Sequence, residues 1–128
     1  MTISRIAAIL SMTLSLTVAA NVAFAQGDAA AGEKLFKKKC ASCHFFDSSG
    51  KKRVGPNLYG VVGRQAGTSP HFPYSNDLKE AGFAWNPQRL DMFLTKPKAM
   101  FKRTRMTFVG LRKPSDRADV IAYLSTAK

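Results

Sequence analysis

The chain has 128 residues and carries 20 Lys and Arg against 8 Asp and Glu, a formal net charge of +12 with a pI near 10.2. This length suits one small domain and excludes a large multidomain protein. Hydrophobic residues make up 45% of the chain, which is too apolar for an intrinsically disordered segment, and two cysteines are too few for a disulfide scaffold. We therefore expect one basic domain folded around a core.

The first 25 residues have the pattern of a cleaved secretory signal peptide. A short basic start ends at Arg5, an apolar run covers 6–20, and the sequence A-F-A at 23–25 places small residues where a signal peptidase cleaves. An uncleaved membrane anchor is the alternative, but the run contains several Ser and Thr and is short for a span of about 20 apolar residues. We expect cleavage before Gln26, a periplasmic protein and one domain over 26–128.

A charged helix is expected from about Ala29 to Lys39, and the sequence C-A-S-C-H follows it at 40–44. C-x-x-C-H is the attachment sequence for c-type haem. Two thiols three residues apart on a helical turn can bond both vinyl groups of one porphyrin edge, while the adjacent His faces the iron. We expect one covalent haem c and its iron, held by Cys40, Cys43 and His44.

Three other interpretations of this motif are a structural disulfide, a thioredoxin-like redox pair and half of a zinc site. The zinc site lacks further ligands, because His71 is the only other His and no other Cys exists. A thioredoxin motif would follow a strand in a βαβ unit, whereas this motif follows a charged helical pattern.

Loops and one further helix are expected in the middle of the chain. Gly and Pro residues over 48–73 indicate loops. Asn86 can cap a helix that has Pro87 at its first position and runs to about Thr95, and the Lys-Pro pair at 96–97 ends it.

The presence or absence of a second axial ligand decides the function of the iron. Without one, the iron has an open face for chemistry; with one, the protein is an electron carrier. Met92 flanks an apolar helical stripe and is a weaker candidate. Met100 and Met106 both fall in the loop expected after Pro97, and spacing from His44 alone favours neither. His71 is the remaining candidate.

The last helix has the clearest pattern. Ser115 can cap it, and Asp116 and Asp119 are expected in its first turn. The apolar positions at i, i+3, i+4 and i+7 that form its buried face are Val120, Tyr123, Leu124 and Ala127.

A series of short motifs follows in order along the chain: G-D at 27–28, G-E-K-L-F at 32–36, C-A-S-C-H at 40–44, G-P-N-L at 55–58, G-R at 63–64, Y-S at 74–75, Trp85, K-P at 96–97, M-T-F-V-G at 106–110 and A-Y-L at 122–124. This series resembles the class I cytochromes c, close to the mitochondrial type and its periplasmic bacterial relatives. The resemblance covers essentially all of 26–128. It implies a small all-α fold in which helices and loops wrap one covalently bound haem and the first and last helices cross, with Gly32 and Phe36 against Val120 and Tyr123.

The resemblance also implies roles for individual residues. Met106 becomes the distal ligand and Met100 a loop residue, while Pro56 packs beside His44 and its region's carbonyl fixes the imidazole N–H. The remaining haem environment consists of Tyr74 and Trp85 as propionate hydrogen-bond donors, Arg64 as a balancing charge, and Phe108 near the exposed haem edge.

Two departures from the family pattern affect the distal side. The family usually has Pro-Gly-Thr-Lys before the ligand Met, where this chain has K-R-T-R at 102–105. We expect a loop without that Pro and Gly to have more backbone freedom in the unfolded chain and to hold Met106 less firmly. Phe93 stands where the family often has Tyr, which removes a hydroxyl near the Met sulfur.

Charge patterning indicates the partners. Seven Lys or Arg and no Asp or Glu lie between Lys96 and Lys113, and further basic runs occur at 34–39 and 51–53. Such runs would ring the haem edge and steer it toward acidic docking patches. We expect no nucleic-acid partner, because no recognition motif appears, and only weak contact with anionic membrane surfaces.

We expect a soluble, monomeric one-electron carrier and not an enzyme. The resemblance implies a quinol-cytochrome c reductase or periplasmic dehydrogenase as donor, and a terminal oxidase, peroxidase or photosynthetic reaction centre as acceptor. The alternative is a gas- or peroxide-binding c-type haem protein, which would result if Met106 leaves the distal site open.

Overall fold

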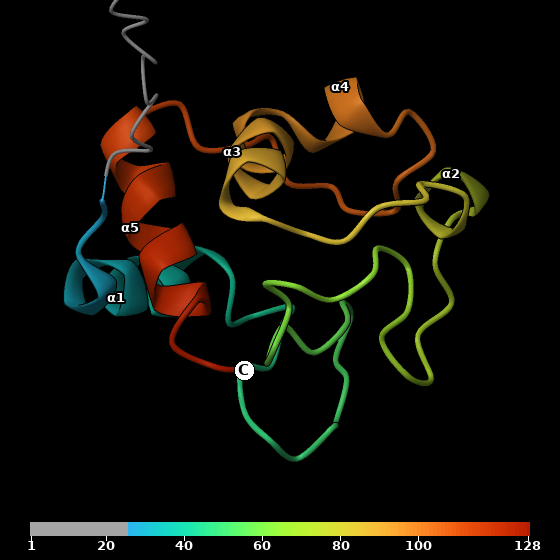
Figure 1. The fold of residues 1–128 in the computed structure, drawn as a ribbon, viewed down its shortest axis with the longest axis horizontal. Helices are drawn as coiled ribbons and strands as arrows, with labels where there is room; N and C mark the ends of the chain where they lie inside the picture. The colour runs from blue at the N-terminus through green and yellow to red at the C-terminus, as the bar shows by residue number, and fades with distance from the viewer. Residues whose placement is uncertain (1–25) are drawn as a thin grey trace, which may run out of the picture.

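The computed structural model describes residues 26–128, so the predicted signal peptide over 1–25 lies outside the described residues. Within this range the chain forms helices and loops with no named strand, which confirms the predicted all-α fold. A long segment without helix or strand connects the first helix to the second, as expected for 48–73 (Figure 1). The helices are α1 (Ala29–Lys39), α2 (Asn76–Lys79), α3 (Pro87–Thr95), α4 (Pro97–Met100) and α5 (Pro114–Leu124).

Helix α1 has the predicted bounds. The side chain of Asp28 accepts hydrogen bonds from the backbone N–H groups of Ala30 and Ala31, which caps the helix start. Three lysines at 37–39 occupy its last turn, where positive charge complements the helix dipole.

The first and last helices cross at close range, as the resemblance implied (Figure 1). A Cβ at Gly32 would overlap the backbone carbonyl of Asp119, so only glycine permits this approach. The backbone N–H of Asp28 donates to Asp119 Oδ1 at 2.8 Å. The rings of Phe36 and Tyr123 lie 5.5 Å apart between centroids. This crossing fixes the C-terminal end of α1, where the C-x-x-C-H sequence begins.

Two predictions about the start of α5 are wrong. Ser115 does not cap the helix, because Pro114 already occupies its first position and Lys113 is the flanking residue. The fixed φ of proline suits that position, and the helix starts two residues earlier than expected. Asp116 lies in the first turn as predicted, but Asp119 lies further along and caps no N–H of its own helix; it binds the start of α1 instead.

The buried face of α5 follows the predicted pattern. Val120 and Leu124 are almost fully buried, and Tyr123 is half-buried. Ala127 is also buried although the helix ends at Leu124, so the buried face continues past the last turn.

Helix α3 begins as predicted, because Asn86 Oδ1 accepts from the backbone N–H of Arg89 at 2.8 Å and Pro87 is the first helical residue. The chain then turns directly into the short helix α4, which contains Met100. The expectation that Met100 lies in an irregular loop is therefore wrong. Proline at 97 ends one helix and is also the favoured first residue of the next.

A partly buried ion pair joins α3 to α5, and the same arginine binds the segment before α5. Arg117 Nε lies 2.6 Å from Asp91 Oδ1, and the same guanidinium donates to the carbonyl of Leu111 at 2.9 Å. It thereby helps to position the extended segment 101–113, which contains Met106.

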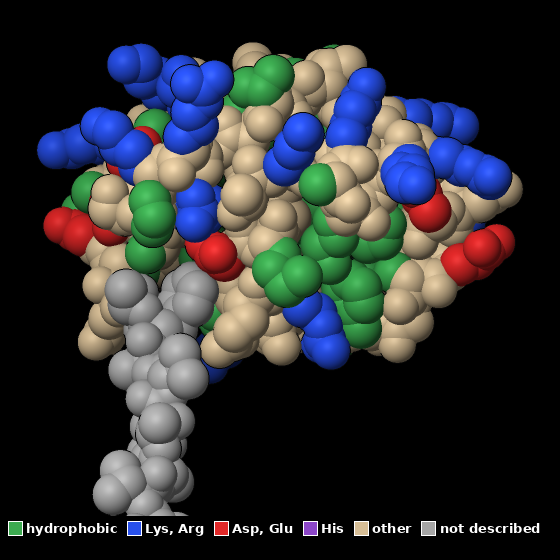
Figure 2. All heavy atoms as spheres, turned by 90° about the horizontal axis from the view of Figure 1, so that it is seen from above, with side chains coloured by type: hydrophobic (Ala, Val, Ile, Leu, Met, Phe, Trp, Pro, Cys, Tyr) green, Lys and Arg blue, Asp and Glu red, His purple; other side chains and the backbone are tan. Residues whose placement is uncertain are grey.

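None of the helices described over 26–128 is long and apolar enough to cross a membrane. Lys and Arg side chains project along much of the rim of the face shown in Figure 2, and Asp and Glu are fewer.

Candidate cofactor site

The C-x-x-C-H residues continue the last turn of α1. The backbone N–H of Cys40 donates to the carbonyl of Phe36 at 2.8 Å, and those of Cys43 and His44 donate to the carbonyl of Cys40 at 3.0 and 2.9 Å. This turn places both cysteines on a hydrogen-bonded backbone. Neither cysteine forms a disulfide, and both are half-buried. Burial, with a smaller contribution from Cys43, raises the pKa of the Cys40 thiol to about 11.

The imidazole of His44 is oriented by the loop that follows it. Its Nδ1 lies 2.8 Å from the carbonyl oxygen of Pro56, and because a carbonyl only accepts, Nδ1 carries the hydrogen. The other nitrogen, Nε2, keeps its lone pair for a metal. Burial lowers the pKa of His44, which favours the neutral form that binds metals.

Gly55 allows the loop to approach the imidazole. A Cβ built at this residue would lie 2.7 Å from Nδ1 and 2.8 Å from Nε2 of His44, closer than real contacts allow. The backbone N–H of Gly55 also donates to the carbonyl of Cys43 at 2.8 Å. The loop is thus bound to the turn of 40–44 through both Gly55 and Pro56.

These residues fit a c-type haem. Two unpaired thiols three residues apart are the groups that form thioethers, and the adjacent imidazole has one nitrogen bound to protein and the other available. The backbone carbonyl that binds Nδ1 fixes both the ring orientation and the tautomer that iron requires.

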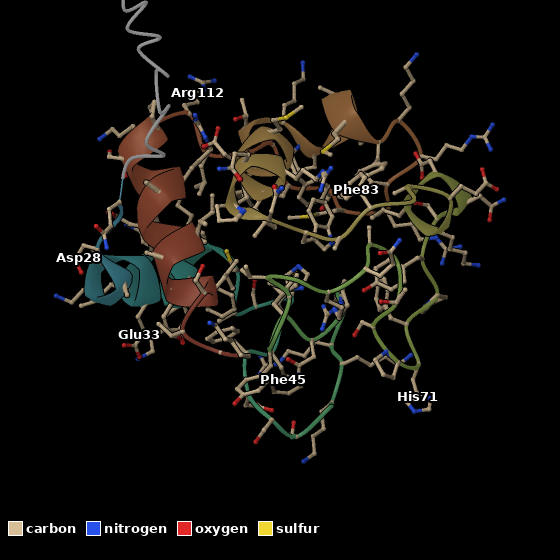
Figure 3. The ribbon with its side chains drawn as sticks, in the orientation of Figure 1. Asp28, Glu33, Phe45, His71, Phe83 and Arg112 are labelled. Carbon is tan, nitrogen blue, oxygen red and sulfur yellow. The ribbon has the colours of Figure 1, made fainter. Side chains whose placement is uncertain are left out.

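The candidates for the distal ligand differ in their surroundings. Met92 is 62% exposed, and Met100 packs against the buried core. His71 is exposed and lies at the outer turn of the loop before α2 (Figure 3). Met106 is half-buried, and its backbone N–H donates to Oγ1 of the buried Thr104 at 3.2 Å. Met106 is therefore the one of these four candidates that is partly shielded without being packed against the core.

Of the three residues predicted at the propionates, Arg64 and Tyr74 have side chains near each other, and the backbone of Trp85 binds that of Arg64. Arg64 donates to the carbonyls of Asn57 and Tyr59 at 3.0 and 3.1 Å, and burial lowers the pKa of its guanidinium. Its own carbonyl accepts from the backbone N–H of Trp85 at 2.9 Å. Burial also raises the pKa of Tyr74, and the nearby charge of Arg64 partly opposes that rise.

Aromatic side chains form the wall beneath this region. Trp85 is buried, and its ring lies 5.2 Å from that of Phe93 and 6.3 Å from that of Phe101. Phe93 has no hydroxyl to contribute, so this wall is apolar at that position. Phe108 is half-buried, packs against the same core and lies two residues after Met106 in the extended segment.

Two residues that organise the site were not predicted from the sequence to do so. Asn57 is buried; its Nδ2 donates to the carbonyl of Asp47 at 3.0 Å, and its Oδ1 accepts from the N–H of Tyr59 at 2.9 Å. The G-P-N-L sequence at 55–58 was the available signal. Arg53 donates to the carbonyl of Ala41 at 2.8 Å, which no pattern indicated.

The family described as Cytochrome c matches this chain over residues 29–128. Cytochrome c of Theileria parva is 45% identical over 107 residues, which cover 84% of this chain and 92% of that protein. Cytochrome c2 of Rhodomicrobium vannielii is 47% identical over 104 residues, covering 81% and 82%. Cytochrome c-type cyt cy of Rhodobacter capsulatus is 51% identical over 100 residues, which cover 78% of this chain and about half, 49%, of that protein.

Replacing Gly55 with Ala tests the approach of the loop to His44. The added Cβ is expected to displace the ring or the loop and to reduce the free energy of unfolding of the haem-loaded protein by about 1–3 kcal/mol. Denaturant unfolding measures this, and Val54→Ala, at the adjacent exposed position, should change it by less than about 0.5 kcal/mol. Equal stability of Gly55→Ala and the parent would contradict the close contact.

Proposed function

The chain belongs to the cytochrome c family and carries a covalently bound haem c for electron transfer, and we propose that it is a one-electron carrier whose iron is bound by His44 and Met106. When bound, haem c supplies an iron that exchanges one electron between the ferric and ferrous states. The observation that carries the proposal is the 2.8 Å contact between His44 Nδ1 and the Pro56 carbonyl, which leaves Nε2 as a ligand. No substrate is chemically transformed, so we infer that the protein is not an enzyme.

The proposed roles of the surrounding residues follow from their chemistry. Cys40 and Cys43 form the thioethers, and Pro56 holds the imidazole. Polar side chains compensate the propionate charge, while an apolar wall limits water near the iron. The polar set comprises Arg64, Tyr74 and Trp85, and the apolar set includes Phe93, Phe101 and Phe108.

The proposed ligand pair is expected to raise the reduction potential of the iron. A soft thioether from Met106 and a low-dielectric environment both favour the less charged ferrous site. Buried aromatic side chains such as Trp85 and Phe101 supply that environment. We therefore propose a carrier with a raised reduction potential, suited to a late position in a respiratory or photosynthetic chain.

The ligand assignment is tested with Met106→Ala. The ferric parent should show the weak near-infrared band that arises from sulfur-to-iron charge transfer, and the variant should lack it because alanine has no sulfur. Met100→Leu is the matched control, because Met100 packs against the core and this swap nearly conserves volume. Its spectrum should keep the band.

Two outcomes would contradict the assignment. A parent spectrum without the band would mean that the K-R-T-R loop does not deliver Met106. Fast, tight binding of carbon monoxide to the ferrous parent would mean an open distal site, and the protein would then be a gas- or peroxide-binding haem protein.

We also propose that the basic runs dock acidic patches on redox partners such as a quinol-cytochrome c reductase, a periplasmic dehydrogenase, a reaction centre or a terminal oxidase. Seven Lys or Arg lie between Lys96 and Lys113 without an acidic residue, and this segment contains Met106 and Phe108. Attraction across such a surface accelerates encounter and orients the exposed edge toward the partner.

Salt dependence measures this docking. Electron transfer from a purified quinol-cytochrome c reductase should slow by about tenfold or more between about 0.01 M and 1 M salt, because the Debye length falls from about 30 Å to about 3 Å. At low salt Lys102→Gln should slow the reaction more than Lys79→Gln, which removes one charge outside the basic runs. Equal rates for the two variants would contradict the proposed surface.

We propose further that residues 1–25 are removed during export to the periplasm. The basic start, apolar run and A-F-A sequence support this. Expression of the full chain with a periplasmic haem-maturation system, followed by mass measurement of the coloured protein, should give a chain that starts at Gln26. A periplasmic product that retains residues 1–25 would contradict cleavage.

A further inference from the structure

We propose that Asp77 is a positioning residue that holds the basic loop over 102–105, and through it Met106, in place. This inference rests on the proposed ligation by Met106. The four residues K-R-T-R at 102–105 include no Pro that would fix a backbone φ angle, so contacts from other segments must restrain this loop.

Asp77 bridges two segments that are far apart in sequence. Its Oδ2 accepts a hydrogen bond from the backbone N–H of Arg103 at 2.9 Å, across 26 residues of chain. Its Oδ1 accepts from the hydroxyl of Ser75 at 2.5 Å and from the backbone N–H of Leu78 at 3.0 Å. The carboxylate is thus fixed to α2 by one oxygen and holds the loop with the other.

The held amide is three residues before the proposed ligand. Phe101 anchors the start of the loop in the core, and Thr104 is buried. Thr104 Oγ1 then accepts from the backbone N–H of Met106 at 3.2 Å. A restraint on Arg103 therefore limits the backbone positions open to Met106.

A second contact ties the same two segments together. The guanidinium of Arg105 donates to the carbonyl of Pro73 at 3.1 Å. These two contacts involve Arg103 and Arg105, the residues on either side of Thr104. The segment 73–77 therefore restrains the loop both before and after Thr104. Both contacts are charge-assisted hydrogen bonds, but only the contact through Asp77 acts directly on the loop backbone.

Both oxygens of Asp77 are needed for this arrangement. Hydrogen bonds from Ser75, Arg103 and Leu78 lower the pKa of the Asp77 carboxyl, so it is ionised at neutral pH and has two acceptor oxygens. Asparagine has the same shape but one acceptor oxygen. Asp77→Asn must therefore lose the hydrogen bond from the backbone N–H of either Leu78 or Arg103, because its amide nitrogen cannot accept.

The decisive experiment measures how readily imidazole displaces Met106 from the ferric, haem-loaded protein. Loss of the sulfur-to-iron band is followed as imidazole is added. We expect Asp77→Asn to raise the apparent affinity for imidazole by about tenfold, because one hydrogen bond to a charged acceptor is lost. Glu80→Gln is the matched control, since Glu80 is exposed on the same turn and its replacement changes the net charge equally. It should leave the affinity unchanged.

The outcomes separate this inference from the proposed function. A parent that lacks the band contradicts ligation by Met106. A parent with the band, together with an Asp77→Asn variant of unchanged imidazole affinity, overturns the role of Asp77 alone. Unchanged imidazole affinity overturns this role even if the variant unfolds at a lower denaturant concentration. A merely structural role of Asp77 would reduce the stability of the protein without raising its affinity for imidazole.

Amide hydrogen exchange in the parent provides a test that needs no variant. The N–H of Arg103 should exchange more slowly than that of Lys102, which has no hydrogen-bond acceptor within the described part of the chain. Equal exchange of the two exposed, adjacent residues would overturn the proposal.

Discussion

The hydrogen bond from His44 Nδ1 to the carbonyl of Pro56 is the interaction on which the candidate site depends. It closes the loop between the end of α1 and the G-P-N-L segment, and it determines which imidazole nitrogen is available. Gly55 makes the contact possible because a side chain there would overlap the ring. The crossing of α1 and α5 at Gly32 positions α1, and the C-x-x-C-H turn at 40–44 continues from the end of that helix.

The two axial sides of the site are stabilised in different ways. The proximal side belongs to a helix end and a short loop, so its geometry follows from local hydrogen bonds around residues 40–56. The proposed distal ligand, Met106, belongs to the segment 101–113, which has no helix or strand. Its position depends on contacts from distant residues, chiefly Asp77 to Arg103 and the ion pair of Asp91 with Arg117.

Much of the fold and the proximal site was predictable because the signals are local. Helix α1 followed from a charged helical run, α3 from its capping residue and the proline after it, and C-x-x-C-H by itself indicated covalent haem. The errors occurred where two local signals competed. Ser115 is a good capping residue, but the proline before it started α5 earlier, and the proline at 97 that ends α3 also begins the helix containing Met100.

The sequence by itself determined the fold class, the family and the attachment residues, because each depends on the identity and spacing of neighbouring residues. Spacing alone left Met100 and Met106 equivalent, and the resemblance favoured Met106; the tertiary structure adds the burial and packing of Met92, Met100 and Met106, which depend on elements elsewhere in the chain. It alone also identified Asp77, whose partner is 26 residues away. No periodicity or spacing encodes such a contact, because it exists only once α2 and the basic loop have been brought together by the folding of the whole chain.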